Sequence, residues 1–213
     1  MGLKKFNAAA ALHEVHERSY ERDEAGLVRQ LRDEDTQVRR LAARDLGLLD
    51  GSARSVAARA LCEALAVEGH ACVRSVLQTS LSQLADPASV PALLALLRSE
   101  DAAQRNGAIE VLAGMPDAVA PYMQAQLRDA DPDVRILSVN LLAELAHPDV
   151  PHWLAQLLDA ETEINVVGAA IEVLGEVGTA EALPALRAVR ERFAADTFTC
   201  FAATLAMERI EAA

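Results

Sequence analysis

Apolar and polar positions along the chain repeat at intervals of 30 to 35 residues, and within each copy they follow the period of an α-helix. Each copy has an anchor position, mostly apolar, and a leucine eight residues later. The six anchors are Val38, Val73, Gln104, Val134, Val166 and Thr197, and the six leucines are Leu46, Leu81, Leu112, Leu142, Leu174 and Leu205. This register predicts six copies of one helical unit.

A further helix is expected ahead of each anchor helix. Four prolines stand at one place in the repeat, and they predict helix starts because a proline in the first helical turn loses no hydrogen bond. They are Pro91, Pro121, Pro151 and Pro184. Acidic turns such as LRDED and LRDADPD follow these helices, and their aspartates are expected to cap the anchor helix. The helix pairs are predicted at about residues 23–50, 51–86, 87–116, 117–147, 148–178 and 179–213.

One helix pair of this size cannot bury its own apolar face, whereas a stack of neighbouring pairs can. We therefore predict an all-α fold, a right-handed α-solenoid of six helix pairs in a single domain (residues 1–213) with an Ala/Leu core and no strand. Residues 7–22 are expected to form an N-terminal capping helix, so that residues 1–22 cover the open end of the first pair.

The anchor helices resemble the HEAT-repeat superfamily in the short form named after phycobilisome lyases, whose second helix reads roughly D-x-x-V-R-x-x-A-x-x-A-L-G. Arginine follows the anchor as Arg39, Arg74, Arg105 and Arg135, and is replaced by Val167 and Phe198. Aspartate precedes the anchor by three residues as Asp35, Asp101 and Asp131. The resemblance implies that these Asp and Arg residues tie neighbouring repeats together. It also implies an architecture shared by scaffolds, adaptors, chaperones and a few enzymes.

Composition excludes several classes of function. The formal net charge of -12 repels a phosphate backbone, so no nucleic-acid partner is expected. No apolar run approaches the roughly 18 residues that cross a bilayer, so no membrane partner is expected either. Three cysteines without a CxxC pair indicate reduced thiols and a cytoplasmic location.

Candidate metal or cofactor chemistry is sparse. His13 and His16 share one leading helix without convergent ligands elsewhere, so no metal site is expected there. His70 and Cys72 are interpreted as a polar turn residue and a buried small thiol. Trp153, the single tryptophan, is expected to be half-buried in a packing role. We predict no catalytic residue, no metal and no cofactor.

The remaining candidate site is the concave groove lined by the second helices. Positions 2, 6 and 10 residues after the anchor should point outward, because positions 3, 4, 7 and 8 carry Ala and Leu. In the sixth unit these positions are Thr199, Ala203 and Met207. The predicted protein-binding residues are Arg40, Arg44, Thr79, Gln83, Asn106, Glu110, Ile136, Asn140, Glu144, Glu172 and Glu176.

Charge along this groove suggests its partner. Between Ile136 and Leu186 there is no Lys or Arg, although eight acids occur there. We therefore predict a non-catalytic interaction scaffold, adaptor or assembly factor that binds a basic or amphipathic segment of another protein, with Ile136 as an apolar anchor. The alternative, implied by the resemblance, is a bilin-lyase-like subunit that handles a tetrapyrrole chromophore.

Overall fold

The computed structural model describes residues 22–212, and within that range it contains twelve α-helices and no strand. In chain order the helices are α1 (Glu24–Gln30), α2 (Thr36–Leu46), α3 (Arg54–Val67), α4 (Ala71–Leu84), α5 (Val90–Ala95), α6 (Ala102–Ala113), α7 (Pro116–Gln126), α8 (Pro132–Glu144), α9 (Val150–Ala160), α10 (Ile164–Val177), α11 (Leu183–Arg192) and α12 (Thr197–Ala212).

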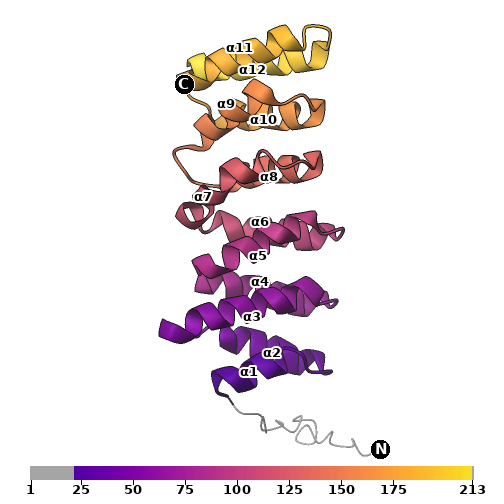
Figure 1. Ribbon diagram of the computed structural model, residues 1–213, viewed down its shortest axis with the longest axis vertical. Coiled ribbons are helices and arrows are strands. Elements are labelled where there is room, and N and C mark those ends of the chain that lie inside the picture. Colours follow the sequence, from indigo (N-terminus) through magenta and orange to yellow (C-terminus); the bar gives the residue numbers. More distant parts are fainter. Residues whose placement is uncertain (1–21, 213) are drawn as a thin grey trace, which may run out of the picture.

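Six helix pairs stack along one axis, from α1 and α2 at one end to α11 and α12 at the other (Figure 1). Each second helix contacts the next one in the stack, from α2 through α4, α6, α8 and α10 to α12. The predicted all-α solenoid of helix pairs is confirmed. The expected capping helix over residues 7–22, with His13 and His16, lies outside the described residues except for Arg22.

Apolar burial follows the predicted register in five of the six second helices. The leucines eight residues after the anchor are all buried at 0–1% exposure, namely Leu46, Leu81, Leu112, Leu142 and Leu174. No helix of residues 22–212 is both long and apolar enough to cross a membrane.

The predicted register of the sixth unit is wrong by two residues. Leu205 is 36% exposed, whereas Thr199, Ala203 and Met207 are buried, although all three were expected to point outward. The position equivalent to Val166 is therefore Thr199, and Met207 takes the place of the core leucine. The spacing from Val166 to its equivalent is therefore 33 residues. A signal for it was present: Asp196 stands three residues before Thr199, as Asp35 stands before Val38, and its carboxylate accepts a hydrogen bond from the Thr199 N–H at 2.7 Å.

Three of the four prolines start helices as predicted, since Pro91, Pro151 and Pro184 lie in the first turns of α5, α9 and α11. Pro121 does not, because α7 already begins at Pro116 and Pro121 lies inside it. The missing N–H of Pro121 deprives only the carbonyl of Asp117 of its helical partner. Both residues are exposed, so water can bind that carbonyl.

The predicted aspartate caps are confirmed. The carboxylates of Asp35, Asp101 and Asp131 accept a backbone N–H two residues later at 2.8–2.9 Å, at the starts of α2, α6 and α8. An N-cap of this type stabilises its helix by about 1 kcal/mol. The caps set where α2, α6 and α8 begin, and therefore which of their residues face solvent.

Candidate functional site

The second-helix face, meaning the solvent-exposed positions of α2, α4, α6, α8, α10 and α12, carries the predicted groove residues. None of them lies in the core. Arg40 and Ile136 are half-buried, and the others are exposed: Arg44, Thr79, Gln83, Asn106, Glu110, Asn140, Glu144, Glu172 and Glu176. Because consecutive second helices are in contact, Glu110, Glu144 and Glu172 occupy neighbouring helices of one face.

Ile136 lies beside a pocket between repeats three and four. The pocket measures 450 Å³, and its wall joins Ile136 and Leu137 of α8 to Arg105 of α6 and to Leu97 and Glu100 in the turn region before α6. The predicted apolar anchor is thus half-buried against its neighbours and offers little free apolar surface.

Sequence reasoning missed a second apolar surface, which we call the α10–α12 groove. It has a volume of 330 Å³ and lies between the exposed sides of the last two second helices. Phe198 and Phe201 are 75% and 65% exposed. The lining residues are Gly168, Ile171, Glu172 and Gly175 from α10, and Phe198, Phe201, Ala202, Leu205, Ala206 and Arg209 from α12. The error in the register of α12 is what concealed this groove.

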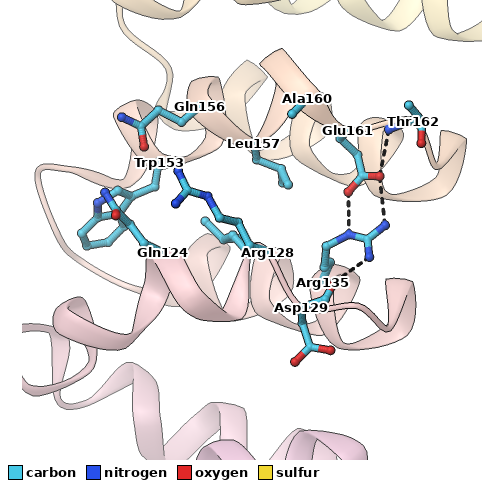
Figure 2. Close-up of a pocket in the computed structure, with 11 residues that line it drawn as sticks. Gln124, Arg128, Asp129, Arg135, Trp153, Gln156, Leu157, Ala160, Glu161 and Thr162 are labelled. Atoms are coloured by element: carbon cyan, nitrogen blue, oxygen red, sulfur yellow. Dashed lines mark hydrogen bonds and ion pairs between the residues drawn. The ribbon is translucent and has the colours of Figure 1, made fainter.

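A pocket of 390 Å³ opens between the ends of α7 and α9 (Figure 2). Gln124 of α7 and Arg128 in the turn after it line one end of the pocket together with Trp153 and Gln156 of α9, while Arg135 and Glu161 close the other end. Its lining mixes an exposed guanidinium and two amides with apolar side chains. Nothing in this arrangement pairs a nucleophile with a base.

Trp153 is more deeply buried than expected, at 7% exposure. Its indole stacks on the imidazole of His147 with ring centroids 4.7 Å apart. The Nδ1 atom of His147 in turn accepts the N–H of Asp149 at 3.1 Å, which orders the turn before α9. The predicted packing role of Trp153 is therefore confirmed, and both rings are engaged in holding this turn.

Arg135 and Glu161 form the polar wall of this pocket. Arg135 donates from Nε to Oε2 of Glu161 at 2.6 Å and from Nη2 to Oε1 of Glu161 at 3.0 Å. Its Nη1 donates to the carbonyl of Asp129. Glu161 also accepts the N–H groups of Thr162 and Glu163, both at 2.9 Å. Burial acts to raise the pKa of Glu161, but these hydrogen bonds outweigh it and hold that pKa below its usual range.

The same arrangement joins repeats one and two. Arg39 donates from Nε to Oε2 of Glu68 at 2.7 Å and from Nη2 to Oε1 at 3.1 Å. The hydrogen bond from Arg39 is the main reason why the pKa of Glu68 is lowered, against the opposing effect of burial. A pocket of 670 Å³ has this pair in its wall. Both pairs join stacked repeats, as the family resemblance implied for the arginines. Their partners are glutamates, whereas the motif aspartates Asp35 and Asp131 cap their own helices.

The other two arginines of the motif behave differently. Arg74 donates to the carbonyls of Glu68 and Gly69 in its own turn and lies 3.7 Å from Asp101 of the next repeat. Arg105 donates to the carbonyls of Ser99 and Glu100 in its own turn. The position that Glu68 and Glu161 occupy in their repeats is taken by Ser99 in the repeat after Arg74 and by Asp129 in the repeat after Arg105.

Repeat five, where Val167 replaces the arginine, uses a substitute from the following repeat. Arg192 at the end of α11 donates to the carbonyls of Leu158, Asp159 and Glu161 at 2.6–3.2 Å. The unsatisfied carbonyls at the end of α9 are thereby paired. The stack keeps its polar link although the motif residue is absent.

Metal and thiol chemistry does not define a site in the described part of the chain. Within residues 22–212 no group of three or more His, Cys, Asp or Glu side chains could hold a metal ion. Cys72, expected to be a buried thiol, is exposed, because it precedes the anchor Val73 in the first turn of α4 and points away from the core. The buried thiol is Cys62 of α3.

Comparison with known proteins agrees with this geometry. The family described as HEAT repeats matches residues 24–113 and 119–196, so the chain belongs to that family. No curated protein matches the chain. Members of this architecture stack helix pairs and commonly present an extended surface to protein partners.

Solved structures similar to this chain share its fold at low identity. The archaeal HEAT-like repeats protein from Thermococcus onnurineus NA1 is 17% identical, with a TM-score of 0.46 and coverage of 89% of this chain and 87% of that chain. The complex of CpcE and CpcF of phycocyanin lyase from Nostoc sp. PCC7120 is 19% identical, with a TM-score of 0.38 and coverage of 100% and 99%. A designed armadillo repeat protein is 17% identical, with a TM-score of 0.40 and coverage of 88% and 100%.

Proposed function

We propose that this protein is a non-catalytic interaction scaffold, adaptor or assembly factor that binds a basic or amphipathic segment of a partner protein along its second-helix face. One observation carries the proposal. Glu110, Glu144, Glu172 and Glu176 are exposed on α6, α8 and α10, while the chain from Ile136 to Leu186 contains no Lys or Arg.

Physical reasoning supports a protein partner over other ligands. A field of one sign along an extended face attracts segments of the opposite charge and rejects acidic ones. Phosphate backbones would be repelled by the same field. The Asp and Arg side chains that do form strong contacts, such as Arg135, are already engaged between repeats. The exposed glutamates of α6, α8 and α10 remain available to a partner on that part of the face.

Affinity on this face should come from several weak contacts. A solvent-exposed ion pair contributes about 0.2–1 kcal/mol. No single glutamate should therefore dominate, and binding should weaken as salt rises, mainly through slower association.

The test uses two labelled helical peptides of about 18 residues, roughly five helical turns. The leucine–lysine peptide carries Leu along one face and Lys along the other, and the alanine–lysine peptide has Ala in place of each Leu. Fluorescence anisotropy measures the affinity of both for the full chain at low and moderate salt. Reversal of Glu144, Glu172 and Glu176 to Lys should abolish binding of the alanine–lysine peptide and leave helicity and Tm nearly unchanged.

A matched control reverses three exposed acids on the opposite layer, Glu63, Glu181 and Glu191, and so makes the same change in net charge. This control variant should retain most of the affinity. If both triple variants lose binding equally, the effect is one of overall charge and the second-helix face is not the site.

A further inference from the structure

The most exposed aromatic side chains of the described residues stand together on α12. Phe198 and Phe201 are 75% and 65% exposed, in a chain with only 3% aromatic residues. Both line the α10–α12 groove, and Leu205 continues the same stripe one turn later. Apolar side chains of this size normally lie in the core, so a cluster left in solvent indicates a surface that another molecule covers.

We infer that the α10–α12 groove is the apolar anchor site of the second-helix face, and that it receives a leucine, methionine or aromatic side chain from an amphipathic helix of the partner protein. The inference rests on the proposed function and deepens it, because the α10–α12 groove takes over the anchoring role that the sequence assigned to Ile136. The partner helix carries lysine or arginine beside its apolar residue, so that its charges lie over Glu172 and Glu176.

The floor of the groove is made by glycine at two positions of α10. A Cβ added at Gly168 would meet no atom within 4 Å, so packing within this chain does not require glycine there. Glycine inside a helix is less stable than alanine by about 1 kcal/mol. Since Gly168 lies in the interior of a 14-residue helix, its effect is to keep the groove open beside Phe198 and Phe201.

Gly175 lies two turns further along the same side of α10. A Cβ at Gly175 would stand 3.6 Å from both the Cβ of Ala206 and an Nη atom of Arg209, which are ordinary contacts. Arg209 of α12 therefore extends to Gly175 of α10 and closes this end of the groove. The open length between Arg209 and Phe198 is bounded by the two helices and lined by apolar atoms on the α12 side.

Charge around the groove selects the class of occupant. Glu172 lines the groove itself and Glu176 is exposed one turn later, so the rim on α10 is acidic, while the α12 side contributes one cation, Arg209, at the far end. An acidic rim repels anionic lipid headgroups and acidic peptides, and it attracts lysine and arginine. An apolar pocket with charges at its edge is the usual composition of a protein-binding hot spot, where aromatic residues contribute most of the affinity. Together these features favour a basic amphipathic helix.

The experiment compares the leucine–lysine and alanine–lysine peptides on the full chain and on two variants. Wild type should bind the leucine–lysine peptide at least about tenfold more tightly than the alanine–lysine peptide. Phe198→Ala with Phe201→Ala should remove that difference. Gly168→Leu should remove it too, by filling the groove, without lowering Tm. Val67→Ala, which alters a side chain 83% exposed on α3, should leave both affinities unchanged.

Glycine amide resonances locate the peptide independently. In ¹H–¹⁵N spectra of the full chain, Gly168 and Gly175 should shift when the leucine–lysine peptide is added, while Gly51 and Gly69 in the second repeat should not. Shifts confined to Gly51 and Gly69 would overturn the inference.

Other outcomes separate the inference from the proposed function. If the two peptides bind wild type equally, or the double Phe variant keeps the difference, the anchor is wrong. The acidic face then still stands if the triple Glu→Lys variant loses the alanine–lysine peptide. If instead the double Phe variant loses the leucine–lysine peptide and the triple Glu→Lys variant does not, the anchor stands and the acidic face is wrong.

Sedimentation tests a second copy of this chain as the occupant. A dimer in wild type that is absent in the double Phe variant would make a second copy the occupant and overturn the partner assignment. Absence of binding to either peptide would overturn both.

Discussion

Arg135 and Glu161 join repeats four and five through two parallel hydrogen bonds, from Nε to Oε2 at 2.6 Å and from Nη2 to Oε1 at 3.0 Å. Their side chains are only 13% and 4% exposed. The carboxylate simultaneously accepts two backbone N–H groups at the start of α10, so one side chain both orders a turn and links two repeats. Geometry of this kind belongs to the stronger class of ion pairs.

Glu161→Ala should therefore destabilise the protein by about 2–3 kcal/mol, because it leaves Arg135 without its partner in a mostly buried place. Glu63→Ala provides the control, since the Arg32–Glu63 pair is 80% and 70% exposed and should matter by no more than about 0.5 kcal/mol. Urea unfolding followed by circular dichroism measures both. Equal effects of the two substitutions would show that the Arg135–Glu161 pair does not hold the stack.

Acid should weaken the fold through the two buried glutamates. Hydrogen bonds hold the pKa values of Glu68 and Glu161 below the ordinary value of 4.5 in the folded protein. A lowered folded pKa means that the stabilisation is fully present above pH 4.5 and is lost as pH falls below it through the folded values.

Replacing both residues by Gln should flatten this dependence. The free energy of unfolding of wild type should fall between pH 5 and pH 3 more steeply than that of the Glu68→Gln, Glu161→Gln variant. Chemical unfolding at a series of pH values gives the two slopes. Parallel slopes would mean that other carboxylates carry the acid sensitivity.

The cysteines should differ sharply in reactivity. Burial raises the pKa of the Cys62 thiol to about 12, so almost no thiolate is present near neutral pH. Cys72 is exposed. With a thiol reagent at neutral pH, Cys72 should be modified rapidly and Cys62 only after unfolding, as peptide mass spectrometry can show. Modification of Cys62 in the native protein at a similar rate would indicate that α3 opens readily.

Two glycine substitutions should have effects of opposite sign. A Cβ at Gly47 would stand 2.6 Å from the Cβ of Ser80 and 2.9 Å from its Cα, so Gly47→Ala forces α2 and α4 apart and should cost about 1–3 kcal/mol. Gly168→Ala enters open space inside a helix and should stabilise by up to about 1 kcal/mol. Thermal unfolding of the two variants decides this. Destabilisation by Gly168→Ala would contradict the open groove floor.

The family resemblance and the aspartate caps were readable because both depend on local sequence. An aspartate three residues before the anchor position caps the same helix, as Asp35, Asp101 and Asp131 show. The register of the last unit is ambiguous in the sequence, because two alignments of α12 both place apolar residues at helical spacing. Aligning on Leu205 put a leucine in the core, whereas the structure buries Met207 instead.

The sequence by itself determined that this chain is a stack of helix pairs, because helical period and repeat length are properties of residues three, four and about thirty positions apart along one chain. Only the tertiary structure decided which polar groups meet between repeats and which apolar groups remain outside. Arg135 reaches Glu161, Arg192 replaces a missing motif arginine, and Phe198 and Phe201 stand beside Gly168 in solvent. These relations depend on the lateral offset between neighbouring helices, and that offset is set by how side chains of two repeats interlock, which no local pattern encodes.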